Sequence, residues 1–240
     1  MRFAAAAALA LLIALPAQAA GKRNVVVFVA DGLRYSSVTP ETAPTMARLR
    51  KEGVDFANSH SIYPTQTTAN ASAIATGHYL GDTGNYANSL YFGFPVPCKQ
   101  NITVAFLEDD CILRDIKGHF PDDYIAQTTL IEAAHNAGLN TVVIGKKGPA
   151  GVQFLASLDS TNDDVGGPLG IFIDEATGHP TNADGSPTKS TMLGTDLATS
   201  IAKVAGGGPA EPAPGVPNLV QQAWQRQAVT QVLIPRLKKA

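Results

Sequence analysis

The chain has 240 residues, of which 45% are hydrophobic and 16% are charged. Its 18 Lys and Arg residues nearly balance 20 Asp and Glu residues, which gives a formal net charge of −2. This balance argues against a nucleic-acid-binding surface, which needs a basic excess. The hydrophobic share is large enough to build a core, which excludes disorder as the main state. The length allows one large domain or part of one.

The first 19 residues have the pattern of a secretory signal peptide. Arg2 supplies a positive charge, an apolar run covers residues 4–15, and Ala17-Gln18-Ala19 has the A-x-A form of a cleavage site. The apolar run is too short to span a bilayer comfortably; an uncleaved N-terminal anchor is the alternative. We therefore expect a periplasmic or secreted protein, with residues 20–240 as its folded part and no membrane segment after cleavage.

Two cysteines, Cys98 and Cys111, lie in the exported part of the chain. In an oxidising compartment such a pair predicts a disulfide, which would contribute about 3 kcal/mol by closing its loop. Two unlinked thiols are the alternative. Because the loop lies between two patterned regions, we expect the bridge to be structural.

Residues 24–30 are predicted to form a buried strand. The run NVVVFVA is almost continuously β-branched or aromatic and does not alternate with polar residues. This pattern is typical of a central strand covered on both faces in a parallel sheet. Asp31 and Gly32 end the run. A helix is expected next, over residues 42–52, with Thr42 as its cap.

The remaining elements complete an alternation of strands and helices. They are an extended segment at 54–63, helices at 67–76 and 128–137, strands at 141–144 and 170–174, a linker rich in Gly, Pro and Ala at 206–217, and a helix at 218–237. This order predicts an α/β fold with a mostly parallel sheet flanked by helices. Such sheets bind ligands beyond the carboxyl ends of their strands.

Two side chains at predicted element ends are candidates for chemistry. Asp31 follows the strand at 24–30, where a carboxylate is a good metal ligand; the alternative is that it caps the following turn. Thr67 begins the helix at 67–76, where the positive end of the helix dipole favours a phosphate or an alkoxide. A metal ion would activate Thr67 as a nucleophile. The alternative is that Thr67 or Thr68 is the N-cap of the helix.

Four motifs occur in order along the chain. They are VVFVADGLR at 26–34, PTQTTAN at 64–70, Ala75-Thr76-Gly77, and GNYANS at 84–89. Together with APTMARL at 43–49, they resemble the N-terminal half of the type I phosphodiesterase/nucleotide pyrophosphatase family, within the alkaline phosphatase superfamily. The resemblance covers residues 24–90 closely and 125–175 loosely.

The resemblance implies a fold, an activity and roles for individual residues. The fold would be an alkaline-phosphatase-like sandwich, and the activity the metal-dependent hydrolysis of a phosphate ester or a nucleotide-like small molecule. Asp31 would bind one of two zinc ions. Thr67 would be the nucleophile and a ligand of the same ion, and would form a phospho-threonine intermediate that water hydrolyses. Asn88 would donate a side-chain N–H to a non-bridging phosphoryl oxygen.

The sequence also departs from the family pattern. The family usually has Thr-Phe-Pro-Asn at the nucleophile, and Thr68 and Ala69 replace the Phe and Pro here, which affects the leaving-group pocket. The sequence lacks the Cys- or Ser-x-Pro-x-Arg motif of sulfatases. Lys146 and Lys147 follow a predicted strand in a region where superfamily monoesterases hold a phosphate dianion. They would then indicate monoester preference; the alternative is a solvated pair on a loop.

The zinc ligands expected from the second half of the family are missing. These are an Asp-x-x-x-His pair, an Asp-His pair and a distal His, and none of the five histidines directly follows an Asp. Asp115 and His119, and likewise Glu175 and His179, have a matching spacing. We interpret both pairs as coincidental because a metal site needs its full ligand set.

We therefore expect only part of one zinc site and an incomplete, N-terminal part of a catalytic domain. A phosphomonoesterase of the same superfamily is one alternative. A non-catalytic fragment or phosphate-ligand binder is another.

Overall fold

The computed structural model describes residues 24–98, 100–104, 110–121, 123–153, 169–173, 194–206 and 219–237. The predicted signal peptide lies outside these residues. The chain divides into two compact units, residues 1–56 and residues 57–240. Among the described helices, none combines the length and the apolar character that crossing a membrane requires.

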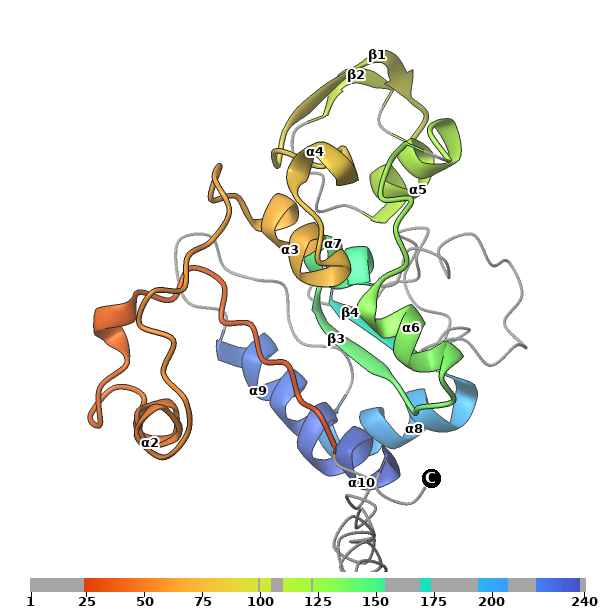
Figure 1. Ribbon diagram of the computed structural model, residues 1–240. Helices are drawn as coiled ribbons and strands as arrows, with labels where there is room; N and C mark the ends of the chain where they lie inside the picture. Colours follow the sequence, from red (N-terminus) through yellow and green to blue (C-terminus); the bar gives the residue numbers. More distant parts are fainter. Residues whose placement is uncertain are drawn as a thin grey trace, which may run out of the picture. The chain divides into compact units, whose positions relative to one another are not determined.

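The first unit contains a short 3₁₀ helix, η1 (Tyr35–Ser37), and helix α2 (Pro44–Glu52) (Figure 1). Proline suits the first turn of a helix because its missing N–H would have no partner there. The helix ends at Gly53, as predicted. Its N-cap is Ala43, which makes no side-chain cap bond, so the prediction of Thr42 as the cap is wrong.

Arg50 joins η1 to α2 within the first unit. Its guanidinium lies 4.8 Å from the centroid of the Tyr35 ring and donates a hydrogen bond of 3.0 Å to the Val38 carbonyl. Among the described residues of this unit, Val38 is the one that is apolar and buried. A single long side chain therefore connects these two elements.

Residues 24–30 form no strand in the structure, so the prediction of a buried central strand is wrong here. The apolar side chains of the run are exposed, from 60% for Val29 to 84% for Val25. A strand buried on both faces needs paired neighbours and two covering layers. The described part of the first unit contains helices and turns but no sheet. Local composition predicts a strand but does not supply its partners.

The described part of the second unit is mixed α/β and contains two separate two-stranded sheets (Figure 1). Strand β1 (Leu90–Val96) pairs antiparallel with β2 (Asn101–Val104). Strand β3 (Val142–Lys146) pairs parallel with β4 (Leu169–Ile173). The strands predicted at 141–144 and 170–174 are therefore present and parallel. The large, mostly parallel sheet that we expected is not found among the described residues, and the β1–β2 hairpin was not predicted.

Several helices lie in the described part of the second unit. They are α3 (Thr67–Thr76), α4 (Leu80–Thr83), α5 (Asp110–His119), α6 (Leu130–Asn136), α7 (Lys147–Gly151), α8 (Gly194–Ala205), α9 (Leu219–Gln227) and α10 (Ile234–Leu237), with a π-helical segment, η3 (Ala228–Leu233), between the last two. Helix α3 agrees with the prediction residue for residue. Gly77 ends it in the left-handed conformation, with φ 72°, which glycine adopts without strain.

Among the described residues of the second unit, the two larger clusters of buried side chains are built as follows. The first joins α3, the β1–β2 hairpin and α5 and consists of Ala75, Leu90, Val96, Val104, Ile112, Ile116, Tyr124, Ile125 and Val152. The second joins α8, α9 and η3 and consists of Ile201, Trp224, Ala228, Val232 and Leu233, with Val142 and Ile144 of β3 packed against it. Helix α3 also contacts α7, which directly follows β3. The body of α3 is thereby held on more than one side.

Candidate functional site

Thr67 is the first residue of α3, and Gln66 is the N-cap, with an extended backbone at φ −104° and ψ 146°. The alternative in which Thr67 or Thr68 is the N-cap is therefore wrong. The first N–H groups of a helix have no carbonyl partner inside the helix, and they form the positive end of its dipole. Thr67 consequently lies at the end of the helix that stabilises negative charge.

Asn88 is held at the same end of α3. Its Oδ1 accepts a hydrogen bond of 3.0 Å from the Thr68 N–H, and its own backbone N–H donates to Gln66 Oε1. These two bonds join Asn88 to both chain neighbours of Thr67. The structure therefore brings parts of the second and fourth motifs together, because Asn88 lies beside the helix end that carries Thr67.

Asn70 holds the segment that precedes α3. Its Oδ1 accepts a hydrogen bond of 2.8 Å from the Ile62 N–H. Its Nδ2 lies 3.1, 3.2 and 3.0 Å from the carbonyl oxygens of Ile62, Pro64 and Gln66. One side chain thus closes the turn that leads to Thr67. In the sequence, Asn70 stands out only as part of the PTQTTAN motif. The signal for its role is its place about one helical turn after Thr67.

A buried polar cluster lies behind the N-terminal turn of α3. Thr68, Ser72, Thr83 and Asn85 are all 0% exposed. Asn85 Nδ2 donates to Ser72 Oγ at 2.7 Å and to the Thr68 carbonyl at 3.3 Å. Ser72 Oγ donates to the same carbonyl at 3.0 Å. The Thr68 side chain, which replaces the Phe of the family pattern, is therefore buried in this cluster and not exposed at the surface.

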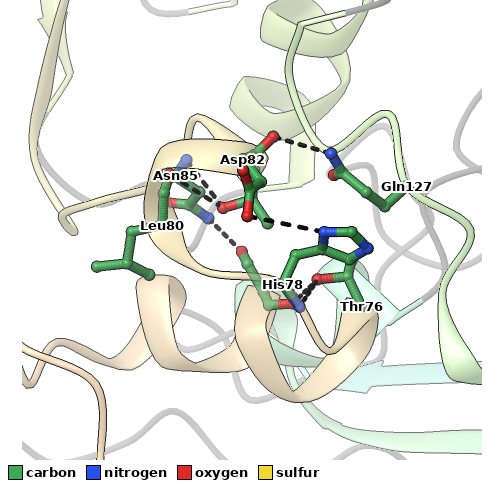
Figure 2. Close-up of polar contacts among 8 residues, drawn as sticks. Thr76, His78, Leu80, Asp82, Asn85 and Gln127 are labelled. Carbon is green, nitrogen blue, oxygen red and sulfur yellow. Dashed lines mark hydrogen bonds and ion pairs between the residues drawn. The ribbon is translucent and has the colours of Figure 1, made fainter.

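The turn and short helix after α3 lead the chain to Asn85, as Figure 2 shows. His78 Nδ1 lies 3.7 Å from Asp82 Oδ2, and Gln127 Nε2 donates to the Asp82 carbonyl at 2.9 Å. Gly84 ends α4 with φ 69°, and a Cβ atom there would approach a backbone oxygen to 3.0 Å. Glycine is therefore required where the chain turns toward Asn85 and Asn88.

Asp31 belongs to the first unit. It occupies a turn in which the Leu33 N–H donates to the Ala30 carbonyl at 3.2 Å and Gly32 has φ 70°. The residue is exposed. Thr67 belongs to the second unit, so each of these two predicted zinc ligands is placed within its own unit only.

The described residues do not by themselves fit a zinc site. Nowhere among them do three or more His, Cys, Asp or Glu side chains gather so as to hold a metal ion, whereas a protein zinc site uses three or four such ligands. Asp115 Oδ2 instead accepts the Cys98 N–H at 2.7 Å. His119 stacks on Phe94, with 3.6 Å between ring centroids. Glu175 and His179 lie outside the described residues.

The structure does not describe the side chains of three further predicted residues, Cys111, Lys146 and Lys147. Cys98 is disulfide-bonded, and the other cysteine in the sequence is Cys111, in α5. Lys146 ends β3 and Lys147 begins α7. The roles predicted for both lysines stay predictions.

A family model matches the part of the chain that contains the four motifs. The family model for Type I phosphodiesterase / nucleotide pyrophosphatase matches residues 25–149, more than half of the 240 residues. The matched range includes Asp31, Thr67 and Asn88. Comparisons with curated proteins and with solved structures found no match. The chain belongs to the type I phosphodiesterase / nucleotide pyrophosphatase family.

Proposed function

We propose that the protein is an exported, metal-dependent phosphoric ester hydrolase that uses Thr67 as its nucleophile. Family membership supports phosphate esters or nucleotide-like molecules as the substrate class. The observation that carries the proposal is the bond from the Thr68 N–H to Asn88 Oδ1. This bond holds a side-chain amide beside the helix end at which Thr67 lies.

In the proposed reaction, Thr67 Oγ1 attacks the phosphorus atom of a phosphodiester and loses its proton to solvent water. The bond from phosphorus to one alcohol oxygen breaks, and the electron pair leaves with that oxygen. Asn88 Nδ2 donates to a non-bridging phosphoryl oxygen, where charge is stabilised in the transition state. Water then attacks the phosphoryl-threonine, releases the phosphate monoester and restores Thr67.

Asp31 and Thr67 are our proposed zinc ligands, each considered within its own unit. Because the described residues do not complete a zinc site, the proposal assigns no step to the metal. Zinc content measured on dialysed protein tests the assignment. We expect less zinc on Asp31→Asn than on the wild type, and equal contents would remove Asp31 from the site.

A non-catalytic phosphate-ligand binder is the second candidate function. The observation that favours it is the same incomplete ligand set among the described residues. A phosphomonoesterase is distinguished by substrate: we expect faster turnover of a diester than of a monoester. A preference for the monoester would instead favour the role predicted for Lys146 and Lys147.

We also propose export to the periplasm or beyond, with cleavage after Ala19. The A-x-A pattern at residues 17–19 supports this proposal. N-terminal sequencing of the protein recovered from a bacterial periplasm tests it. A mature chain that starts at Ala20 is the expected result, and a retained Met1 would contradict cleavage.

Hydrolysis by a matched pair of threonine variants tests the nucleophile. Turnover of bis(p-nitrophenyl) phosphate and p-nitrophenyl phosphate is measured with added zinc. We expect Thr67→Ala to abolish turnover and Thr65→Ala, at an exposed position two residues earlier, to retain it. Wild-type turnover in Thr67→Ala would exclude Thr67. A wild type that binds phosphate in calorimetry but hydrolyses neither ester would establish the binder.

A further inference from the structure

Gln66 has an unusual relation to the helix that it precedes. It occupies the N-cap position of α3 but makes no side-chain bond to the first turn. Its Oε1 instead accepts the backbone N–H of Asn88. The acceptor that an N-cap side chain normally supplies comes from Asn88 Oδ1, which accepts the Thr68 N–H at 3.0 Å. Asn88 therefore supplies the capping acceptor for α3, while the Gln66 side chain binds the Asn88 backbone.

The backbone of Gln66 is held in place by Asn70. Its carbonyl oxygen accepts two hydrogen bonds from Asn70, one from the backbone N–H and one from Nδ2, each 3.0 Å long. Its side chain is half-buried. The two bonds from Asn70 hold the Gln66 backbone at the start of α3, and the Gln66 side chain extends from this held position to the Asn88 N–H.

The loop that carries Asn88 is fixed from the other side by Asn85. Asn85 is 0% exposed, and its Nδ2 bonds to Ser72 Oγ and to the Thr68 carbonyl at 2.7 and 3.3 Å. Thr68 therefore has its N–H bound by one asparagine and its carbonyl bound by the other. The bond from Asn88 to Gln66 supplies the remaining constraint, on the Asn88 backbone.

An asparagine side chain offers one acceptor oxygen and one donor NH₂ group in a single plane. With Asn88 Oδ1 bound to the Thr68 N–H, the direction of Nδ2 depends on where the Asn88 backbone lies. Gln66 Oε1 sets that backbone position. We propose that Gln66 is a positioning residue, which aims the Asn88 amide donor at a phosphoryl group on Thr67 without touching the substrate. This inference rests on the proposed roles of Thr67 and Asn88.

A residue that acts only through Asn88 has no effect once the Asn88 amide is gone. A double-mutant cycle measures this dependence directly. Gln66→Met removes the acceptor and keeps an unbranched side chain of similar length. Asn88→Ala removes the donor that is to be positioned. Gln127→Met is the matched control, because it removes a glutamine bond to a backbone carbonyl that does not involve Asn88.

We expect Gln66→Met to lower kcat for bis(p-nitrophenyl) phosphate about 10- to 100-fold, as displacement of a catalytic group does, with KM little changed. We expect Asn88→Ala to lower kcat about 100- to 1,000-fold, and the double variant to be no slower than Asn88→Ala. Gln127→Met should have the same small effect with and without Asn88. All variants are compared below the lowest midpoint of thermal unfolding.

Two results would overturn the inference. One is a wild-type kcat in Gln66→Met, and the other is an equal fold-loss from Gln66→Met in the presence and absence of Asn88. A wild type without turnover would contradict the proposed function instead. The same cycle is then measured as affinity for inorganic phosphate: Gln66→Met must weaken binding only where Asn88 is present, and equal weakening in both backgrounds contradicts the positioning role.

Discussion

Thr68 is buried, and both of its backbone polar groups are hydrogen-bonded. Its N–H and carbonyl are bound by Asn88 and Asn85, and its side chain is buried. Within the part of the chain that the structure describes, its Oγ1 has no hydrogen-bond partner. The residue after the proposed nucleophile therefore belongs to the buried polar cluster behind the first turn of α3.

Tyr124 is the titratable side chain that burial affects most clearly among those described. It is 3% exposed, and its hydroxyl has no hydrogen-bond partner among the described residues. Burial raises the pKa of the Tyr124 hydroxyl, because the ionised form is poorly solvated. An unfolded tyrosine loses its proton near pH 10, at about its ordinary pKa. The folded protein keeps the proton, so its stability falls as the pH rises above that value.

We predict that Tyr124→Phe reduces this alkaline loss of stability. At pH 7 the variant should be as stable as the wild type or more stable, because a buried hydroxyl without a partner costs about 1–3 kcal/mol. Urea unfolding at neutral pH and at about pH 11 measures both effects. Tyr79→Phe, at an exposed position, is the control. A Tyr124→Phe protein that is clearly less stable at pH 7 would show that the hydroxyl makes a stabilising bond.

At the scale of elements, α6 has the most complete local start signal. Thr129 Oγ1 accepts the Glu132 N–H at 3.2 Å, and Glu132 Oε2 accepts the Thr129 N–H at 2.8 Å. The Thr129 hydroxyl also donates to the Gln153 carbonyl at 2.8 Å. One buried threonine therefore both caps α6 and connects it to the segment that follows α7.

We predict that Thr129→Ala lowers the free energy of unfolding by about 1–2 kcal/mol, the usual cost of losing an N-cap hydroxyl. Thr129→Ser keeps the hydroxyl and should cost less. Thr128→Ala, at the exposed neighbouring position, is the control for chemical denaturation. An equal loss in Thr128→Ala and Thr129→Ala would contradict a specific role for the capping box.

The helices that sequence predicted correctly are those with local signals. Pro44 marks the start of α2 and Gly77 marks the end of α3. The β1–β2 hairpin was missed although apolar residues alternate from Leu90 to Val96, because Gly93 and Pro95 within that run argue against a strand. The run at 24–30 was predicted wrongly because a strand depends on partners elsewhere in the chain.

The same distinction applies to the site. Thr67 was predicted from its place at the start of a helix, and Asn88 from family resemblance. The parts played by Gln66 and Asn85 were not predicted, because they depend on hydrogen bonds to residues about 20 positions away in sequence. No periodicity or capping rule reports such bonds.

At the scale of the whole molecule, the family match at residues 25–149 crosses the boundary between the two units at residues 56 and 57. Asp31 belongs to one unit and Thr67 to the other. The proposal that Thr67 is the nucleophile concerns a single residue of the second unit. It is therefore tested most directly by a covalent mark on that residue.

The measurement is mass spectrometry of protein that is quenched with acid during turnover of bis(p-nitrophenyl) phosphate and then digested with a protease. If Thr67 is the nucleophile, we expect a p-nitrophenyl phosphoryl group on the Thr67 hydroxyl. Thr67→Ala treated in the same way should carry none. If turnover occurs while the Thr67 peptide stays unmodified and another residue carries the phosphoryl group, Thr67 is not the nucleophile.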